Sequence, residues 1–275
     1  MAVAVDTLRV VYAALAEDVG AGDVTTEATV DADASGTAEL VVKEPGVVCG
    51  LDAAEAVFRA LDADIRFETL ADEGSWVDGP AVVARVEGLE RAILTGERTA
   101  LNFLGRLSGI ATLTRRYVDA VSGTGAAILD TRKTTPGLRV LEKHAVACGG
   151  GRNHRLALDD GVLVKDNHLR AAGSISAAVA RLRDATPLPI EVECDTLDQV
   201  SQALDAGADA LLLDNMSLDM LVAAVSLAKG RARLEASGGI TLENVRAVAE
   251  TGVDEISIGA LTHSARSLDV SLELA

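Results

Sequence analysis

Residues 188–214 read LPIEVECDTLDQVSQALDAGADALLLD. Two short apolar runs, at 188–194 and 209–214, enclose a segment at 196–206 whose apolar residues recur with helical spacing. A strand, a helix and a second strand in this order are typical of parallel strands joined by a right-handed crossover. The stretch therefore predicts a parallel sheet covered by helices.

The same unit recurs along the chain after residue 123. Strand-like runs alternate with helical segments, and this alternation with its spacing favours a β/α barrel or an incomplete one. A doubly wound open sheet is the competing architecture, but no GxGxxG follows any of the strands. The expected strands are 126–131, 161–165, 188–194, 209–214, 231–236 and 253–259, and the expected helices lie near 137–148, 173–185, 196–206, 217–229 and 241–251.

The first part of the chain has a different rhythm and is expected to be α+β. It contains two helical segments, 6–18 and 51–61, a loop at 20–26, and strand-like runs at 37–42, 65–70 and 81–86. Residues 89–122 then show helical periodicity throughout. The Ser108-Gly109 pair inside this long segment suggests two helices or one bent helix.

A cation-rich stretch, residues 130–165, stands out in a chain whose formal net charge is −17. Its Lys and Arg residues follow two strand-like runs or lie in a Gly-rich turn, which are places where a scaffold presents groups to a ligand. Because an Arg side chain matches carboxylate or phosphate oxygens two at a time, the implied ligand is small and multiply anionic. The seven cations are Arg132, Lys133, Arg139, Lys143, Arg152, Arg155 and Lys165.

Most of the expected barrel strands finish in a charged residue or a glycine. In a β/α barrel these ends share one rim, where the chemistry is placed. Glu193 and Asp214 facing a phosphorylated ligand are typical of a Mg²⁺ site, and the glycines of 237–241, between a strand and a helix start, suit a phosphate. The strand-end residues are Arg132, Lys133, Lys165, Glu193, Asp214, Ser237, Gly238 and Gly259.

Two acids lie two residues before strand-end residues, on the same face of each strand. Asp130 precedes Arg132, and Glu191 precedes Glu193. They are expected to form a deeper layer that orients the rim cations. A buried ion pair without functional consequence is an equally open interpretation.

Composition excludes several classes of function. No apolar run approaches the ~18 residues of a membrane span, and residues 1–15 do not have the pattern of a signal peptide. A pI near 4.6 and 2% aromatic residues disfavour nucleic-acid binding. Cys49, Cys148 and Cys194 lie far apart without CxxC spacing, which favours a reducing, cytoplasmic setting and argues against a thiolate metal site.

Several segments together resemble the quinolinate phosphoribosyltransferase family, the carboxylating nicotinate-nucleotide pyrophosphorylases. The resemblance extends in order over nearly the whole chain, and DTRKTTPG with GGGRNHR is its specific part. Gly105 and Ala147 stand where bulkier residues would be expected. The segments are EDVGAGDVTT (17–26), ERTALNFLGRLSGIAT (97–112), DTRKTTPGLRVLEKHAV (130–146), CGGGRNHR (148–155), VLVKDNH (162–168), LLLDNM (211–216) and EASGGI (235–240).

The resemblance implies an α/β protein with two domains, an N-terminal α+β sandwich over 1–110 and an incomplete β/α barrel over 111–275 that carries the active site. The last few residues are expected to be able to rejoin the first domain. It also implies a homodimer, with larger oligomers left open. The implied reaction is Mg²⁺-dependent transfer of phosphoribosyl from phosphoribosyl pyrophosphate to quinolinate, giving nicotinate mononucleotide, pyrophosphate and CO₂ in NAD synthesis.

The resemblance also implies roles for individual residues. It assigns quinolinate to Arg132, His154, Arg155 and Lys165, with Arg98 entering from the other subunit, although the sequence alone favours Arg98 as a surface or salt-bridged arginine. Lys133, Lys165, Glu193 and Asp214 are the expected catalytic residues. The positions matched to the phosphosugar and its metal are Lys133, Glu193, Asp214, Ser237, Gly238 and Gly259, with His263 close by.

Three other functions stay open at this point. Lys165 at a strand end beside a phosphate loop also suits a Schiff-base aldolase. A molybdenum-associated pyrophosphorylase-like protein is the nearest relative outside the family. A sensor that binds phosphorylated metabolites without turnover is the non-enzymatic alternative.

Overall fold

The computed structural model describes residues 5–275. The stretch 1–15 was expected not to be a signal peptide, and its first four residues lie outside the described residues. The chain forms two compact units, and neither is one continuous segment. The first unit contains the chain up to residue 115 together with 134–150 and 260–275, whereas the second contains 116–133 and 151–259. The first unit therefore takes in segments from both sides of residue 110.

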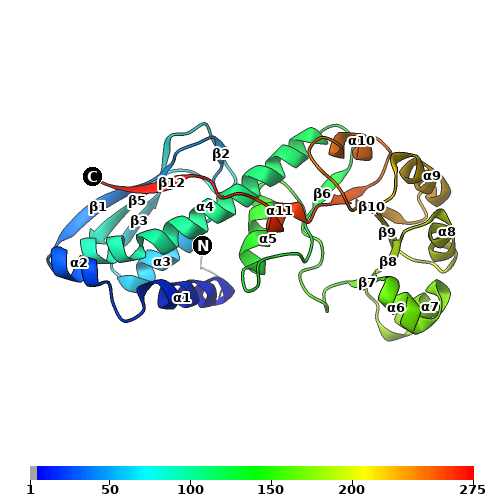
Figure 1. Cartoon of the computed structure of the whole chain (residues 1–275), viewed down its shortest axis with the longest axis horizontal. Helices are drawn as coiled ribbons and strands as arrows, with labels where there is room; N and C mark the ends of the chain where they lie inside the picture. Colours follow the sequence, from blue (N-terminus) through cyan, green and yellow to red (C-terminus); the bar gives the residue numbers. More distant parts are fainter. Residues whose placement is uncertain (1–4) are drawn as a thin grey trace. The chain divides into compact units, whose positions relative to one another are not determined.

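The first unit is built on an antiparallel sheet in the order β12-β1-β5-β3. The expected strands at 37–42, 65–70 and 81–86 are confirmed, and the carboxyl-terminal strand β12 pairs with β1, as Figure 1 shows. A two-stranded sheet, β2 with β4, was not expected. The bounds are Ser35–Val42 (β1), Gly46–Val47 (β2), Arg66–Thr69 (β3), Trp76–Val77 (β4), Ala81–Leu89 (β5) and Val270–Leu274 (β12).

Helices complete the first unit and bury their apolar faces. The helix α3 buries Leu51, Val57 and Phe58, which are less than 2% exposed. Between α1 and β1, where a loop was expected, Asp23 accepts a hydrogen bond from the Thr26 N–H at 3.0 Å and begins the short helix α2. The bounds are Val5–Val19 (α1), Val24–Thr29 (α2), Leu51–Leu61 (α3), Glu90–Ala120 (α4), Arg139–Cys148 (α5) and Ala260–His263 (α11).

The long segment after β5 is a single helix, α4, of 31 residues, so of the two expected alternatives the one with a single helix holds. Gly109 does not break it, because the carbonyl of Arg266 occupies the place that a Cβ would take. Gly105 is similar: its carbonyl accepts the Leu268 N–H at 3.0 Å. Both glycines let the segment at 266–268 pass directly against the helix, which also explains the unexpectedly small residue at 105.

The second unit contains a six-stranded parallel sheet in the order β6-β11-β10-β9-β8-β7. All six expected strands are confirmed. From β7 to β11 the strands lie in the sheet in the order in which they follow in the chain, and β6 lies beside β11. This order is typical of a barrel, because a doubly wound sheet reverses its strand order partway. The two edge strands, β6 and β7, do not pair with each other within residues 5–275, so the barrel is incomplete. The bounds are Ala127–Leu129 (β6), Val162–Val164 (β7), Ile190–Cys194 (β8), Ala210–Asp214 (β9), Arg233–Ser237 (β10) and Glu255–Ser257 (β11).

Helices follow the strands and line the outer side of the sheet (Figure 1). Their starts are capped by Ser174, Thr196 and Ser217, whose hydroxyl oxygens accept backbone N–H groups of the first turn. Among residues 5–275, no helix is both long and apolar enough to cross a membrane. The bounds are Asp166–Ala172 (α6, unexpected), Ile175–Ala185 (α7), Leu197–Asp205 (α8), Leu218–Ala228 (α9) and Val245–Ala249 (α10).

Candidate active site

The register of the parallel strands decides which side chains meet inside the incomplete barrel. Asp214, Ser237 and Ser257 lie opposite one another on β9, β10 and β11. Two residues earlier, Glu235 stands opposite Glu255. Since paired residues share a face and alternate residues return to it, these rows form successive layers of one interior.

The strand ends enclose a cavity of about 260 Å³, here called the strand-end cavity. Eight of the expected site residues line it: Arg132, Lys133, His154, Arg155, Lys165, Glu193, Asp214 and Ser237. Gly238 is the residue after Ser237 in the chain, and Gly259 follows β11 by two positions. Arg98 and His263 belong to the first unit. The remaining lining residues are Thr131, Leu163, Leu212, Glu235 and Ser257.

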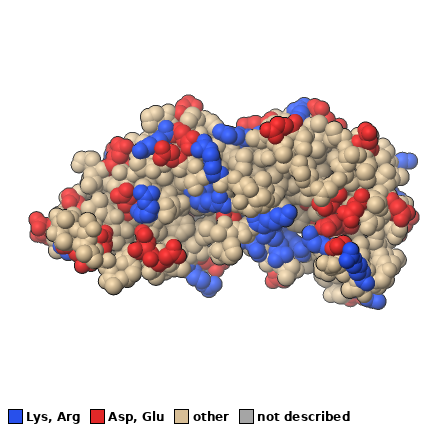
Figure 2. All heavy atoms as spheres, viewed as in Figure 1, with Lys and Arg blue, Asp and Glu red and all other residues tan. Residues whose placement is uncertain are grey.

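Cations and carboxylates are already paired at the mouth of the strand-end cavity. Lys165 Nζ lies 2.9 Å from Glu193 Oε2, and Asp214 Oδ2 accepts a hydrogen bond from the amide of Asn215 at 2.7 Å. On the face that Figure 2 shows, Lys and Arg side chains gather in one area although acids predominate in the chain. Each carboxylate thus has one oxygen engaged in the chain and offers its other oxygen to a ligand.

His154 lies below the rim and connects the deeper acids. Its backbone N–H donates to Asp130 Oδ1 at 2.9 Å, and its Nε2 lies 3.0 Å from Glu191 and 3.4 Å from Glu235. Burial lowers the pKa of the ring, but the hydrogen bonds with the two carboxylates and their charges outweigh it and raise the pKa to about 10. Asp130 and Glu191 therefore lie deeper than the rim and hold His154, whereas their orienting the rim cations stays a prediction.

Two guanidinium groups face the same anionic ligand space. Arg155 Nη1 donates to the Gly161 carbonyl at 2.9 Å, and both burial and the nearby charge of Arg132 lower the pKa of Arg155. The Nε atom of Arg132 is buried and has no hydrogen-bond partner among residues 5–275. Like charges held this close repel each other until an anion binds between them. A dianion with two acceptor groups would satisfy both.

The turn after β10 has the backbone shape expected of a phosphate-binding loop. Gly238 and Gly239 have φ of +89° and +63°, and the side chain of Asn215 occupies the place that a Cβ on Gly238 would take. Asn244 donates to the Gly239 carbonyl at 2.9 Å and so closes the turn. The helix that follows begins only at Val245, so the expected helix start near 241 is wrong.

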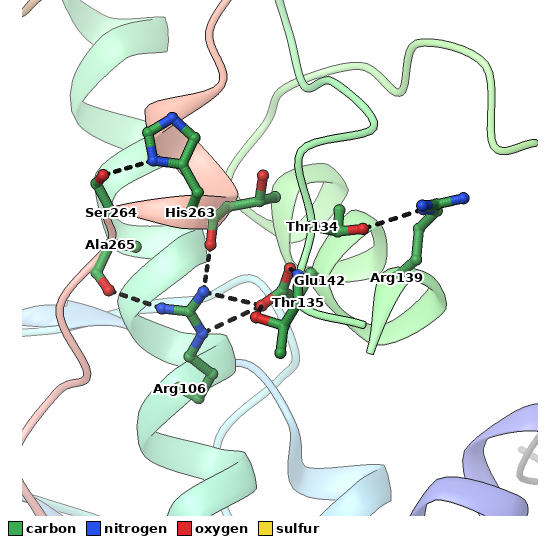
Figure 3. Close-up of polar contacts among 9 residues, drawn as sticks. Arg106, Thr134, Thr135, Arg139, Glu142, His263, Ser264 and Ala265 are labelled. Atoms are coloured by element: carbon green, nitrogen blue, oxygen red, sulfur yellow. Dashed lines mark hydrogen bonds and ion pairs between the residues drawn. The ribbon is translucent and has the colours of Figure 1, made fainter. Parts of the chain in front are cut away.

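A network in the first unit holds the segments that follow Lys133 and precede the carboxyl terminus (Figure 3). Arg106 donates to Glu142 Oε1 at 2.8 Å, to the Ala265 carbonyl at 2.7 Å and to the Thr262 carbonyl. The buried Glu142 also accepts from the N–H and hydroxyl of Thr135 at 3.0 and 2.8 Å. The network fixes α11, which carries His263, onto α4 and α5.

Two family models match the chain almost end to end. Residues 23–108 match the N-terminal domain of quinolinate phosphoribosyl transferase, and residues 110–273 match its C-terminal domain. This chain belongs to the quinolinate phosphoribosyl transferase family.

Curated and solved members of the quinolinate phosphoribosyl transferase family are similar over their full length. A probable carboxylating nicotinate-nucleotide pyrophosphorylase from Synechocystis is 48% identical and covers 94% of this chain and 90% of the relative. The carboxylating enzyme of Mycobacterium leprae is 45% identical over 98% of this chain and 96% of its own. The solved nicotinate-nucleotide pyrophosphorylase from Francisella tularensis has a TM-score of 0.95 at 41% identity, covering 98% and 96% of the two chains.

Sequence analysis missed some cavity residues of this family member, and for two of them a signal was present. Glu235 lies two residues before Ser237, and Ser257 lies two before Gly259. The alternation that led from Glu193 back to Glu191 would have found both. Leu163 and Leu212 carried no such signal, because an apolar residue inside an apolar run looks like core.

Proposed function

We propose that this chain transfers the phosphoribosyl group of phosphoribosyl pyrophosphate to quinolinate, with decarboxylation, to give nicotinate mononucleotide, pyrophosphate and CO₂ for NAD synthesis. Membership of the quinolinate phosphoribosyl transferase family supports the reaction. The observation that carries it is the strand-end cavity, where cations and carboxylates divide the lining. A dicarboxylate and a phosphosugar need these two kinds of lining side by side.

Quinolinate is the ligand of the cationic side. The guanidinium groups of Arg132 and Arg155 with Lys165 Nζ bind its two carboxylates, and this leaves the ring nitrogen facing the sugar. Holding two reactants in such an arrangement can supply about 7–11 kcal/mol of the barrier. His154, held by Asp130 and Glu191, keeps the floor of this site rigid.

Phosphoribosyl pyrophosphate is the ligand of the carboxylate side. Gly238 would offer its backbone N–H to the sugar phosphate, Ser237 and Gly259 would belong to the same phosphosugar site, and Lys133 would bind phosphate oxygens. Glu193 and Asp214 would hold Mg²⁺ together with substrate phosphates, because each keeps a carboxylate oxygen outside its contact within the chain. When bound, the ion would stabilise the charge of the departing pyrophosphate.

The bond changes require no redox cofactor. The lone pair of the ring nitrogen forms the bond to the anomeric carbon while the carbon–oxygen bond to pyrophosphate breaks, and pyrophosphate leaves with that electron pair. The ring is then cationic, so the adjacent carbon–carboxylate bond can break. CO₂ leaves, the electron pair stays on the ring carbon, and a proton from water completes nicotinate mononucleotide.

Arg98, His263 and the dimer belong to the same proposal. In a homodimer Arg98 would enter the other subunit's site and contact quinolinate, and His263 would lie close to the phosphosugar. Arg98→Ala and Arg132→Ala should each be inactive. When the two variants are mixed in equal amounts and their subunits pair at random, half of the dimers contain one subunit of each kind. Each mixed dimer has one intact site of its two, so the mixture should regain about a quarter of wild-type activity. Recovery near zero would remove Arg98 from the partner site.

The free cysteines, Cys49, Cys148 and Cys194, support a cytoplasmic location, because thiols stay reduced in a reducing compartment. Fractionation of cells with an antibody against the chain checks this. A signal confined to the membrane or secreted fraction would contradict it.

One assay tests the function as a whole. Purified protein is supplied with carboxyl-labelled quinolinate, phosphoribosyl pyrophosphate and Mg²⁺, and labelled CO₂ is counted with and without a chelator. Arg132→Ala should lower kcat/KM by about 100-fold or more, since truncating a partner of a desolvated charge pair costs about 2–5 kcal/mol. Arg170→Ala is the matched control, because this side chain is 80% exposed.

The alternative functions give different results in the same experiment. An aldolase would trap a carbonyl substrate on Lys165 with borohydride and release no CO₂ from quinolinate. A sensor would bind both ligands without turnover and tolerate Glu193→Ala. Either result would overturn the proposed reaction.

A further inference from the structure

Four potential metal ligands meet in the first unit, and none of them lines the strand-end cavity. Cys49, Glu73, His144 and Cys148, here called the Cys–Glu–His cluster, have ligand atoms that all lie within 4.8 Å of one another. Cys49 and Glu73 come from the connections before α3 and before β4, and the other two lie one turn apart on α5. Residues four apart on a helix share a face, so both side chains point to the same place.

Three distances in the Cys–Glu–His cluster match a tetrahedral ion. Cys148 Sγ lies 3.4 Å from His144 Nε2 and 3.8 Å from Glu73 Oε2, and the last two atoms are 3.9 Å apart. Zinc bonds of about 2.0–2.3 Å at tetrahedral angles put neighbouring ligand atoms roughly 3.3–3.8 Å apart. These three atoms would need shifts of a few tenths of an ångström to bind one ion, and the ligand atom of Cys49 lies within 4.8 Å of the others.

The backbone around the buried ligand is fixed in advance. The Ser108 hydroxyl accepts the Cys49 N–H at 2.9 Å and donates to the Cys49 carbonyl at 3.0 Å. The Glu73 loop is held by the Gly74 N–H, which donates to the Val48 carbonyl at 2.8 Å. Two of the four ligands therefore come from segments that cannot drift apart without breaking these bonds.

Glu73 joins the start of α3 to the other ligands. Its Oε1 accepts the N–H groups of Gly50 and Leu51 at 2.9 and 2.6 Å. Its Oε2 also accepts the Gly50 N–H, at 3.1 Å, and is the atom nearest Cys148 and His144. An ion bound to Oε2 would replace this longer contact with Gly50, while Oε1 continues to hold both N–H groups.

The cluster is accessible from one side. The side chain of His144 is 53% exposed and that of Glu73 24%, whereas Cys49 is buried. An ion can reach the cluster through the exposed histidine, and its binding would displace the thiol protons of the two cysteines to solvent.

We propose that Cys49, Glu73, His144 and Cys148 form a structural Zn²⁺ site that ties α5 to the two connections of the first unit. Two sulfurs, one imidazole and one carboxylate are ligands that zinc accepts together, whereas Mg²⁺ and Ca²⁺ prefer oxygen alone. Four protein ligands leave no open position, which makes the site structural and separate from the chemistry of the strand-end cavity.

The test uses the full chain, reduced with a phosphine and freed of metal. Zn²⁺ alone is titrated against a chromophoric chelator, and Co²⁺ is added separately for its spectrum. The expected result is one ion per chain, a thiolate-to-cobalt charge-transfer band, a tetrahedral cobalt spectrum and a higher Tm with Zn²⁺. A Co²⁺ complex without the thiolate band would overturn the proposal, and so would a stoichiometry of zero.

Variants identify the ligands. Cys148→Ser and His144→Gln should each weaken Zn²⁺ binding at least ~100-fold, more than the loss of an outer-shell partner does. Cys194→Ser is the matched control, because Cys194 is a buried cysteine of the second unit and should change nothing. Circular dichroism and CO₂ release confirm that each variant is folded. Equal Zn²⁺ affinity in wild type and Cys148→Ser would also overturn the proposal.

Discussion

The strand-end cavity and the Cys–Glu–His cluster are assembled in opposite ways. The cavity collects residues from equivalent positions of a repeated strand-helix unit, so its members recur at the ends of apolar runs. The cluster joins Cys49 and Glu73, from two irregular connections, to one face of α5. A site built from repeated units can therefore be predicted from the sequence, whereas a site formed where unrelated segments meet once cannot.

The two regions also manage charge differently. In the cavity and the layer below it, like charges are held together: burial and the charge of Arg132 lower the pKa of Arg155, and burial and the charge of Glu235 raise the pKa of Glu191. In the cluster, two thiols shift in opposite directions: a hydrogen bond with Cys49 lowers the pKa of Cys148 to about 5, while a hydrogen bond with Cys148 and burial raise the pKa of Cys49. The first arrangement favours a bound multiply charged substrate, and the second favours a bound cation.

The largest effect is expected at the mouth of the cavity. Glu193→Gln removes the carboxylate that pairs with Lys165 and the charge offered to a substrate-bound cation. We expect kcat/KM for CO₂ release to fall by about 100-fold or more. Asp195→Asn is the control, because this exposed acid lies two residues further on and outside the cavity lining. Equal losses in both variants would mean that the overall negative charge of the chain, and not the cavity, determines the rate.

Features that are encoded locally could be predicted from the sequence, whereas features that depend on contacts between distant segments could not. The six strands and the strand-end members of the cavity were predictable because alternation of apolar and polar residues encodes them locally, whereas His154 came only from the family resemblance. The sequence could not decide between one and two helices over 89–122, because Gly109 is explained by the carbonyl of Arg266, 157 positions away in the chain. Likewise, the spacing of Cys49 and Cys148 argued against a thiolate site, yet folding brings their sulfurs into one cluster. Such long-range contacts leave no periodic trace.

A smaller effect is expected in the rates of thiol labelling, which should differ between Cys148 of the cluster and Cys194, the cysteine outside it. Metal-free protein treated with iodoacetamide at pH 7 should be alkylated first at Cys148, which is a half-buried thiolate. Burial raises the pKa of Cys194 to about 12, so its rate should be at least ~10-fold lower. Peptide mass spectrometry measures both rates. The Cys148 rate should stay flat from pH 8 to 6, and a tenfold fall per pH unit would contradict its lowered pKa.

The scaffold of the cluster should matter for stability. Ser108→Ala removes the hydroxyl on α4 that hydrogen-bonds both backbone groups of the buried Cys49. We expect a loss of about 1–3 kcal/mol in the free energy of unfolding, measured with urea. Ser201→Ala, at an exposed position of α8, should change it by less than about 0.5 kcal/mol. A neutral Ser108→Ala variant would show that Cys49 is held by packing alone.

The smallest effect, at most about 1.4 kcal/mol per pH unit for one proton, is expected from His154 in the cavity. Its pKa is raised to about 10 in the folded chain from an ordinary value of 6.5. A raised pKa contributes stability that is complete below pH 6.5 and is lost as the pH rises toward 10. The urea midpoint should therefore fall more steeply between pH 7 and 9 in wild type than in His154→Gln. Proton NMR of the four histidines gives a readout independent of the variant's folding, since one ring should stay protonated to pH 9. If all four rings titrate near pH 6.5, Glu191 and Glu235 do not hold a proton on His154. The buried charges below the cavity would then not differ from those of the cluster in the way described.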